Sequence, residues 1–576
     1  FNQNIGSWNT ANVIGMVRMF TNANSFNQDI SGWNTAKVGS MISMFELATS
    51  FNQNIGNWNT GAVTDMTKMF QWATSFNQNL GNWSLNASVD MRNMLDNCGM
   101  DCYNYAQTLI GWNATGPNGR SLGAKNLNYG SQATAARANL TGPKGWTITG
   151  DVQSNICDAF ITRWNVAGTT TLSFGTATSG TVNYTWKEVS PGTKSGSGSF
   201  SGNTLTINGL PSTTIDLFIA PANFQRIIIG NNQPLSHRLL DVKQWGTTAW
   251  TSMQNAFFGC SNLNITATGI PDLSLVTRAE QMFQDCEKLT GPANIGSWNV
   301  STITNMTSMF NGCKLFNQNI GNWNTANVTT MQNMFSKAGS FNQNIGGWNT
   351  AKLTRTSGMF DGASSFNQNI GGWNTAAVTM MDKMFQNATS FNQNLGNWKL
   401  NASVDMSNML NNSGLDCSNY SATLVGWNAN PSTPNGRSLG AAGRTYGGPA
   451  ATTARANLTG TKGWTITGDA SSIICGISSA PSERLRTELV GEGSKVDENV
   501  YPNPFVGRVT IDADLKDVTE KDIKLVDLLG REFRPLSTRK ISVTRMELDL
   551  SNLVTGQYFI KINSKSGTKV FKVMRQ

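Results

Sequence analysis

Hydrophobic and polar positions follow a pattern that returns every 25 residues through two blocks of the chain. In one copy, Phe51, Gln53 and Ile55 alternate with asparagines, as in a strand that turns one face inward. Apolar residues from Val63 to Ala73 then recur at the spacing of one face of a short helix. Each repeat is therefore predicted to be a strand, a turn and a short helix. Eight copies open with phenylalanine, at Phe1, Phe26, Phe51, Phe76, Phe316, Phe341, Phe366 and Phe391.

A fixed period of this length is the signature of a solenoid. One copy buries too little apolar surface to offset the cost of ordering its backbone, so the copies must stack. Gln53 is expected to point inward and form an interior amide ladder, while its asparagine neighbours face outward. The outward asparagines are candidates for a ligand-facing ladder: Asn52, Asn54, Asn317, Asn319, Asn342, Asn344, Asn367 and Asn369.

The repeat core, MF-x-x-A-x-x-FNQ-x-I-x-x-W-N, resembles the BspA-like leucine-rich-repeat surface proteins of bacteria. The resemblance covers residues 1 to about 110 and about 250 to 425. It implies a curved β/α solenoid at the cell surface, often with an adhesive role, and it names no ligand.

The period breaks after each block. From Asp101, a helical run, a Gly/Pro/Asn loop, a second helix (residues 133–140) and a strand at residues 146–148 predict a cap, and a matching cap recurs at residues 415–469. Between the blocks, short alternating strands separated by Gly, Ser and Pro turns predict a small β-sandwich that looks like an Ig/PKD-like module.

The predicted fold class is multidomain, with two β/α leucine-rich-repeat-like solenoids, an intervening Ig/PKD-like β-sandwich and a C-terminal Ig-like β-sandwich. The predicted domains are a first solenoid with its cap (1–157), the sandwich (158–243), a second solenoid with its cap (244–475), a linker (476–499) and a C-terminal module (500–576).

Cysteines fall into two groups. Cys102 and Cys157 bracket the first cap, and Cys417 and Cys475 bracket the second in the same sequence frame, which predicts two equivalent disulfides and an oxidising, exported setting. The alternative is four unpaired buried thiols. Three further cysteines occupy one slot of the repeat that alanine fills elsewhere, so they are predicted to be small core residues rather than metal ligands. The pairing state of Cys98, Cys260, Cys286 and Cys313 is left open.

The last 76 residues carry the strings YPNPF, DLLGRE, LVTGQYFIKI and a final KVMR. Together they resemble the C-terminal sorting domain of type 9 secretion substrates in Bacteroidota; an ordinary Ig-like module is the alternative. The resemblance implies export by an outer-membrane translocon, binding to a shuttle β-barrel and, usually, cleavage and anchoring to surface polysaccharide. We expect residues 570–573 to form an exposed final strand open to strand addition. The motif residues are Tyr501, Pro502, Asn503, Pro504, Gly530, Gly556, Tyr558 and Lys572.

Charge and composition narrow the function further. The formal net charge is +9 and charged residues make up 13% of the 576 positions, without a basic run, which argues against nucleic-acid binding. Charge density rises after the second cap, as expected for a separate C-terminal module. The chain contains no run of 18 apolar residues, so no transmembrane helix is predicted. The chain begins inside a repeat, so Phe1 is expected to open a fragment or a processed piece.

Candidate chemistry is sparse. The single histidine, His237, is expected in a solvated loop, and no nucleophile elbow, metalloprotease or phosphate-loop spacing occurs. We therefore expect no enzyme, no cofactor and no metal site. The favoured function is a cell-surface adhesin or interaction scaffold on the outer face of the outer membrane, with repeats that contact polysaccharide or a surface protein. The alternative is a non-catalytic accessory region of a larger secreted enzyme whose catalytic domain precedes Phe1.

Overall fold

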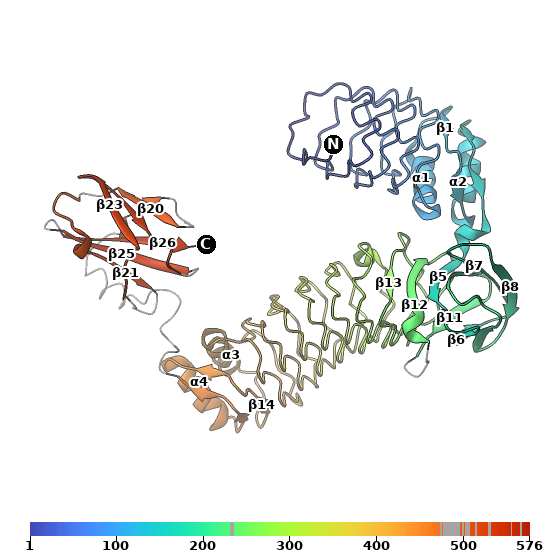
Figure 1. The fold of residues 1–576 in the computed structure, drawn as a ribbon. Helices are drawn as coiled ribbons and strands as arrows, with labels where there is room; N and C mark the ends of the chain where they lie inside the picture. The colour runs from blue at the N-terminus through green and yellow to red at the C-terminus, as the bar shows by residue number, and fades with distance from the viewer. Residues whose placement is uncertain are drawn as a thin grey trace. The chain divides into compact units, whose positions relative to one another are not determined.

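The computed structural model describes residues 1–230, 235–472, 475, 496–497, 500–501, 507–512, 515–527, 532–553, 556–564 and 567–575 (Figure 1). Within these residues the regular elements are 26 short strands and four α-helices. The chain divides into two compact units. The first comprises Phe1–Arg444 and Ala454–Asp469, and the second comprises Thr445–Thr453 and Ala470–Gln576.

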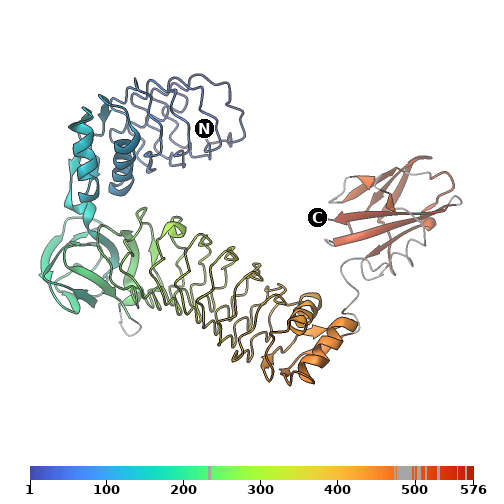
Figure 2. The ribbon, with the colours of Figure 1, turned by 180° about the vertical axis from the view of Figure 1, so that it is seen from behind.

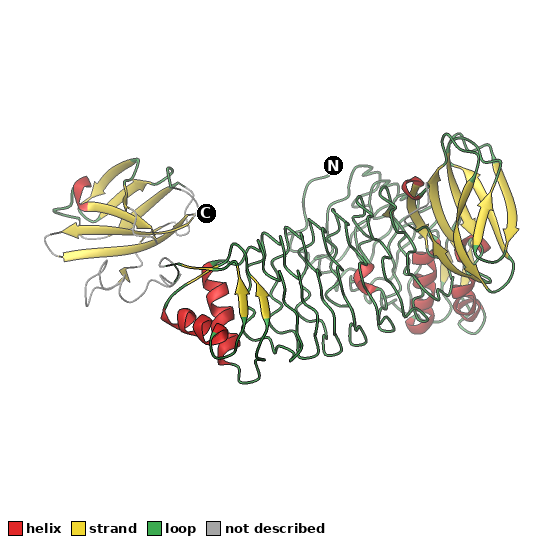
Figure 3. Cartoon of the chain, turned by 90° about the horizontal axis from the view of Figure 1, so that it is seen from below, coloured by secondary structure: helices red, strands yellow, loops and turns green. Residues whose placement is uncertain are grey.

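The repeat blocks are arrays of turns. Residues 1–101 and 299–416 contain turns and single bridge residues, with neither a helix nor a strand, and Figure 3 draws these coils as loops lying one on the next. Parallel bridges join equivalent positions of successive coils. In the first array they link Gly15, Ser40, Asp65 and Asp90, and in the second they link Arg278, Asn305, Thr330, Arg355, Met380 and Asp405.

The prediction of two β/α leucine-rich-repeat-like solenoids is therefore wrong. The helix expected at residues 63–73 cannot form, because Lys68 and Trp72 have left-handed backbone angles, with φ of 57° and 60°. The amide N–H groups of Met66, Lys68 and Phe70 donate to carbonyls of the next coil at 2.8–3.0 Å, instead of to the carbonyl four residues earlier. The strand expected at residues 51–55 is absent as well.

Tight turns explain why the sequence looked helical. Between the inter-coil bonds, Met69 donates to the carbonyl of Met66 and Ala73 donates to that of Phe70, both at 3.0 Å. These three-residue steps place apolar side chains inward at nearly the spacing of a helix face. Periodicity alone did not separate a short helix from a series of turns.

Aromatic columns fill the interior of both arrays. Phe51 stacks between Phe26 and Phe76, whose ring centroids lie 5.9 and 6.0 Å from its own. The ring centroid of Phe45 lies 3.9 Å from that of Phe51. Phe366 stacks between two equivalents at 6.0 Å in the second array. Both side chains are completely buried. Each ring therefore depends on both neighbouring coils for its contacts.

Buried polar groups are also satisfied between coils. The indole N–H of Trp58 donates to the carbonyl of Ile30 at 3.2 Å, and that of Trp348 donates to Ile320 at 3.1 Å. The hydroxyl of Thr60 donates to the carbonyl of Ser84 in the following coil at 2.9 Å. Because a lone coil would leave these groups without partners, stacking is required for its polar groups as well as for its apolar ones.

Each array ends in a helical cap (Figures 1 and 2). The first cap pairs β1 with β3 and β2 with β4 in parallel. Its first helix begins after Asp101, whose carboxylate accepts from the N–H of Asn104 at 2.8 Å. The helix packs closely on the last coil, because a Cβ on Gly111 would lie 2.3 Å from the carbonyl oxygen of Gly81. The elements are α1 (Cys102–Thr115), β1 (Ser121–Gly123), β2 (Asn128–Tyr129), α2 (Ser131–Thr141), β3 (Thr147–Thr149) and β4 (Val152–Gln153).

The second cap repeats this order of elements. Strand β14 pairs with β16 and β15 with β17, again in parallel. The predicted cap helices are thus confirmed in both places. The elements are α3 (Cys417–Ala429), β14 (Ser438–Gly440), β15 (Thr445–Tyr446), α4 (Pro449–Thr459), β16 (Thr465–Thr467) and β17 (Ala470–Ser471).

Two sheets follow the first cap. One has the order β13-β12-β5-β10-β7-β8 and the other β11-β6-β9. Their core includes Trp164 stacked on Phe174 at 5.2 Å. The elements are η1 (Asn155–Asp158), β5 (Phe160–Asn165), β6 (Leu172–Thr178), β7 (Val182–Glu188), β8 (Ser195–Phe200), β9 (Thr204–Ile207), β10 (Thr214–Ile219), β11 (Phe224–Ile228), η2 (Ser236–Arg238), β12 (Leu239–Gln244), β13 (Asn264–Ile265) and η3 (Ile295–Ser297).

The C-terminal residues form two more sheets, with orders β18-β26-β25-β21-β22 and β19-β20-β24-β23. Apolar side chains from both sheets make one core, including Val509, Leu525, Leu548, Ile560 and Phe571. The elements are β18 (Val496–Asp497), β19 (Val500–Tyr501), β20 (Arg508–Asp512), η4 (Glu520–Asp522), β21 (Ile523–Asp527), β22 (Glu532–Phe533), β23 (Ser537–Ser542), β24 (Arg545–Asp549), β25 (Gly556–Ser564) and β26 (Gly567–Arg575).

Candidate functional site on the outer face of the repeat arrays

The asparagines that open each repeat form rungs between coils. The Oδ1 atom of Asn52 accepts from the backbone N–H of Asn77 and from Nε2 of Gln78, both at 2.8 Å. Asn342 makes the same pair of contacts with Asn367 and Gln368, both at 2.9 Å. Asn317 and Asn367 accept likewise from the coil that follows each of them. The carbonyl oxygen of each of these side chains is therefore used by the stack.

The second row of predicted asparagines is exposed and closes local turns. Oδ1 of Asn54 accepts from the N–H of Gly56, two residues later, at 3.0 Å. Asn319, Asn344 and Asn369 do the same with their own following glycines. Among the described residues, no hydrogen bond is recorded for the Nδ2 groups of these four side chains. The two rows can thus offer a ligand mainly amide donors.

The glutamine that follows the first rung lies at the surface. Gln53 is half-buried, and its Nε2 donates to the carbonyl and the Oδ1 of Asn27 in the preceding coil at 2.8 and 2.9 Å. The expected interior amide ladder is therefore wrong in its location, because the inward positions are filled by the aromatic columns.

Positions on the bridged face differ from coil to coil. The bridge residue and the residue two places later are polar or charged in most coils, whereas the Met and Phe positions beside them repeat. We call these positions the ladder face. In the first array it comprises Gly15, Val17, Ser40, Ile42, Asp65, Thr67, Asp90 and Arg92. In the second it comprises Arg278, Glu280, Asn305, Thr307, Thr330, Gln332, Arg355, Ser357, Met380, Asp382, Asp405 and Ser407.

Two apolar side chains stand out beside this face. Leu47 and Trp72 occupy equivalent positions of adjacent coils, with 37% and 48% of their surface exposed. Both have left-handed backbone angles, with φ of 61° and 60°, a conformation that bulky residues rarely adopt. The hydrophobic periodicity did not predict these two residues, although a comparison of the repeats would have singled them out. In every other regular coil this slot holds Asn, Asp, Gly or Lys: Asn22, Asn97, Asp285, Gly312, Lys337, Gly362, Asn387 and Asn412.

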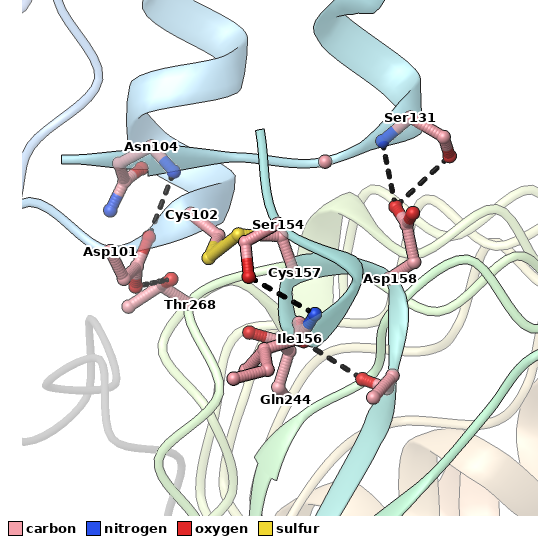
Figure 4. Close-up of a disulfide and its surroundings, with 12 residues drawn as sticks. Asp101, Cys102, Asn104, Ser131, Ser154, Ile156, Cys157, Asp158, Gln244 and Thr268 are labelled. Atoms are coloured by element: carbon pink, nitrogen blue, oxygen red, sulfur yellow. Dashed lines mark hydrogen bonds between the residues drawn. A yellow bond between two sulfur atoms is a disulfide. The ribbon is translucent and has the colours of Figure 1, made fainter. Parts of the chain in front are cut away.

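The first predicted disulfide is present and ties the first cap to the chain that leaves it (Figure 4). Cys102, at the start of α1, is bonded to Cys157 in η1. Around it, Ser131 donates its N–H and its hydroxyl to Asp158 at 2.9 Å, and Thr268 donates its hydroxyl to Asp101. The sulfur bridge is thus one of several links between the cap and the residues that follow.

Of the remaining cysteines, two are bonded as predicted and four, whose pairing was left open, are free. Cys417 and Cys475 are both disulfide-bonded, while Cys98, Cys260, Cys286 and Cys313 are free thiols. Burial raises the pKa of the Cys98 thiol to about 12, and burial likewise raises the pKa values of the three fully buried thiols. These four groups are therefore protonated at neutral pH, as expected of core residues.

Both caps bury the same charged triad. In the first, the carboxylate of Asp151 is inaccessible and accepts from Arg137 at 2.7 and 3.0 Å and from the hydroxyl of Tyr105 at 3.0 Å. In the second, Asp469 accepts from Arg455 at 2.8 and 2.9 Å and from Tyr420 at 3.0 Å. The pKa of Tyr105 is raised, first by its burial and then by the Asp151 charge.

The sorting-motif residues are only partly described. Tyr501 lies in β19 opposite Thr510, Gly556 begins β25, and Lys572 lies in β26 opposite Phe559. Tyr558 is buried, with its ring 5.7 Å from that of Phe533. Pro502, Asn503, Pro504 and Gly530 lie outside the described residues.

The final strand is not an edge strand, contrary to expectation. Strand β26 pairs with β25 along its whole length and with β18 at residues 570–571. Its side chains Val570, Phe571 and Val573 are buried in the core. Among the described strands, the ends of the two sheets are β18 and β22, and β19 and β23.

The structure also shows where His237 lies and how the potential metal ligands are arranged. His237 lies in the short helix η2 and is exposed, so its predicted contact with solvent is confirmed. Among the described residues, no cluster of three or more His, Cys, Asp or Glu side chains is arranged to hold a metal ion. No helix in the described part of the chain has both the length and the apolar character needed to span a membrane.

Two family models match parts of the chain. The repeat blocks match a family described as Mycoplasma protein of unknown function, DUF285, at residues 1–108, 251–358 and 318–427. Residues 499–576 match the family described as secretion system C-terminal sorting domain. A comparison with curated proteins gives no match. The C-terminal match indicates a protein secreted by the type 9 system, to the cell surface or outside the cell.

Proposed function

We propose that this chain is a BspA-like surface protein that acts as a non-enzymatic adhesin or interaction scaffold. In this proposal the C-terminal domain delivers the chain to the outer face of the outer membrane, through a translocon and a shuttle β-barrel. The two arrays then present their outer faces to polysaccharide or to a surface protein. In this proposal the repeats bind the ligand, and the sorting domain directs export.

The observation that carries the proposal is the contrast between repeated and varied positions within one chain. Residues that stack coils, such as Phe51, Trp58 and Asn52, recur at the same place in successive copies. Positions on the ladder face change from coil to coil, and the exposed pair Leu47 and Trp72 departs from the residue types that suit its backbone. Strained positions of this kind collect at ligand-binding sites.

The first experiment tests export. The full chain and a variant lacking residues 500–576 are expressed in a bacterium with a type 9 system, and external protease is added to intact cells. The full chain should be cleaved at the surface, and the shortened chain should remain in the periplasm, protected. Surface exposure of the shortened chain would contradict the role given to the sorting domain.

The second experiment tests adhesion. Cells that display the full chain should attach to a polysaccharide-coated surface or to partner cells, and Trp72→Ala should reduce attachment several-fold, because an exposed indole supplies contact area at little entropic cost. Asn387→Ala changes the equivalent position of the second array and serves as the matched control. Equal attachment by cells with and without the protein would refute the adhesive role.

A further inference from the structure

A polar cavity opens on the ladder face where the first array meets its cap. Its volume is about 460 Å³, within the range of sites for small ligands. Two coils and two cap strands contribute to it, so it exists only because the array and the cap share one continuous parallel ladder. Its lining consists of Thr67, Arg92, Asn93, Ser121, Leu122, Gly123, Thr147 and Thr149.

A glycine lets the cap pack closely on the last coil beside this cavity. Met91 bridges to Leu122, and Gly123 pairs with Thr149 in β3, so Gly123 lies between Arg92 and Thr149 in the ladder. A Cβ on Gly123 would lie 2.3 Å from the backbone nitrogen and Cα of Asn93. The close approach of the two backbones therefore requires glycine. This packing brings Arg92 of the last coil and the hydroxyls of Thr147 and Thr149 to the lining of one cavity.

The charges at the cavity are balanced. Arg92 donates from Nε to both oxygens of Asp90, at 3.1 and 2.9 Å, and its terminal nitrogen lies 2.7 Å from Asp90. The hydrogen bond from Arg92 lowers the pKa of Asp90, and the partner carboxylate raises the pKa of Arg92. Both groups stay ionised at neutral pH. Asp90 lies outside the lining and neutralises Arg92, and the other lining side chains carry no charge.

We propose that this cavity binds a neutral polysaccharide through adjacent hydroxyl groups of one sugar unit. A sugar hydroxyl both donates and accepts, so a neighbouring pair can accept from Arg92 while donating to a lining hydroxyl such as that of Thr149. The hydroxyls of Thr67, Ser121 and Thr147 offer further partners of the same kind. An acidic ligand is disfavoured because the single cation is already paired. The inference rests on the proposed surface function and names a ligand class and a site for it.

The second array lacks this site at the same place. Met406 bridges to Leu439, and Gly440 repeats the close approach of Gly123. Ser407 replaces Arg92, and it donates to Asp405 at 2.6 Å, while Asp382 replaces Thr67. The equivalent face thus has two carboxylates without a guanidinium, and it supplies a matched internal control.

The test measures binding of the purified full chain to soluble mannan, galactan and dextran, with alginate as the acidic probe, by affinity electrophoresis and calorimetry. Arg92→Ala removes the paired donor, and Thr147→Trp fills the cavity from an exposed strand position. We expect at least a tenfold rise in Kd for a neutral polysaccharide with each variant, and less than a twofold change with Ser407→Ala. Unchanged circular dichroism of each variant verifies folding.

Each of the following results would overturn the inference. Unchanged Kd in both Arg92→Ala and Thr147→Trp would place binding elsewhere, and Trp72-dependent adhesion in the same protein would then leave the proposed function standing. Binding to alginate alone would reject the neutral ligand class. Failure of the wild-type chain to bind any of the three neutral polysaccharides would reject the inference, and loss of cell adhesion as well would reject the proposed function with it.

Discussion

The two repeat arrays have the same interior and different outer faces. Both contain stacked phenylalanines about 6 Å apart, the same tryptophan-to-carbonyl bonds and the same asparagine rungs. Their ladder faces share few residues, and the first array alone carries the exposed Leu47 and Trp72 and the cavity at Arg92. Interior positions contact equivalent positions in two neighbouring coils, so a change at one site disturbs three coils. Outward positions lack this constraint and can differ.

The two caps likewise share their buried interactions but differ in their contacts with other parts of the chain. Each buries an Asp–Arg–Tyr triad, and each carries a bonded cysteine at the start of its first helix. In the first cap, Asp101 also accepts from Thr268, a residue 167 positions later. The first cap therefore contacts a distant segment as well as closing its own array.

The largest expected effect comes from the aromatic columns, where the two arrays should respond alike. Phe51→Ala and Phe366→Ala each remove a buried ring that contacts both neighbouring coils, so each should destabilise its array by about 3–5 kcal/mol. Guanidinium unfolding of the full chain, followed by tryptophan fluorescence, measures the loss. Phe1→Ala is the control, because Phe1 is 64% exposed. A loss in one array alone would show that the columns are not equivalent.

The buried triads come next and compare the two caps. Asp151→Ala and Asp469→Ala leave a partly buried guanidinium without its partner, which should cost about 1.5–3 kcal/mol. Melting temperature and protease sensitivity of each cap report the effect. Lys125→Ala, at an exposed position of the first cap, is the control. Equal stability of wild type and both variants would mean that the triads are not stabilising.

A smaller effect is expected at the asparagine rungs. Asn52→Ala and Asn342→Ala each remove one oxygen that accepts two inter-coil hydrogen bonds, so each should cost about 1 kcal/mol. Asn52→Asp retains the accepting oxygen and should lie close to wild type. If the Ala and Asp variants were equally destabilised, the lost interaction would not be the hydrogen bond, and the rung would need another explanation.

The smallest effect concerns the free thiols, which differ in number between the arrays. With a pKa of about 12, roughly one Cys98 thiol in ten thousand is ionised at pH 8. Iodoacetamide should therefore label neither Cys98 nor the buried row in the native protein, and all four after unfolding. Raising the pH toward 12 should raise the rate at Cys98 about tenfold per unit. Fast native labelling at pH 8, detected by mass spectrometry, would contradict the assigned burial.

Several features were predictable because they depend on residues close in sequence. The helical run predicted from Asp101 is present as α1, and the disulfides followed from cysteines in matching frames. The strands predicted between the two blocks are also present, among them β5, β6 and β10. The family match at residues 499–576 agrees with the motif-based prediction of a sorting domain. The domain boundaries and the ligand-facing role of the asparagines stay predictions.

The 25-residue period, the identity of the stacking residues and the two cysteine pairs were predictable, because each of these repeats along the chain and can be recognised by comparing copies. The tertiary structure was needed to define the form of the coil, since left-handed residues such as Lys68 and Trp72 and the bonds to the next coil replace a helix that the apolar spacing also fits. It also decided that β26 is internal and that Arg92, Gly123 and Thr149 share one cavity. Those outcomes depend on which segments become neighbours, and no local pattern contains that information.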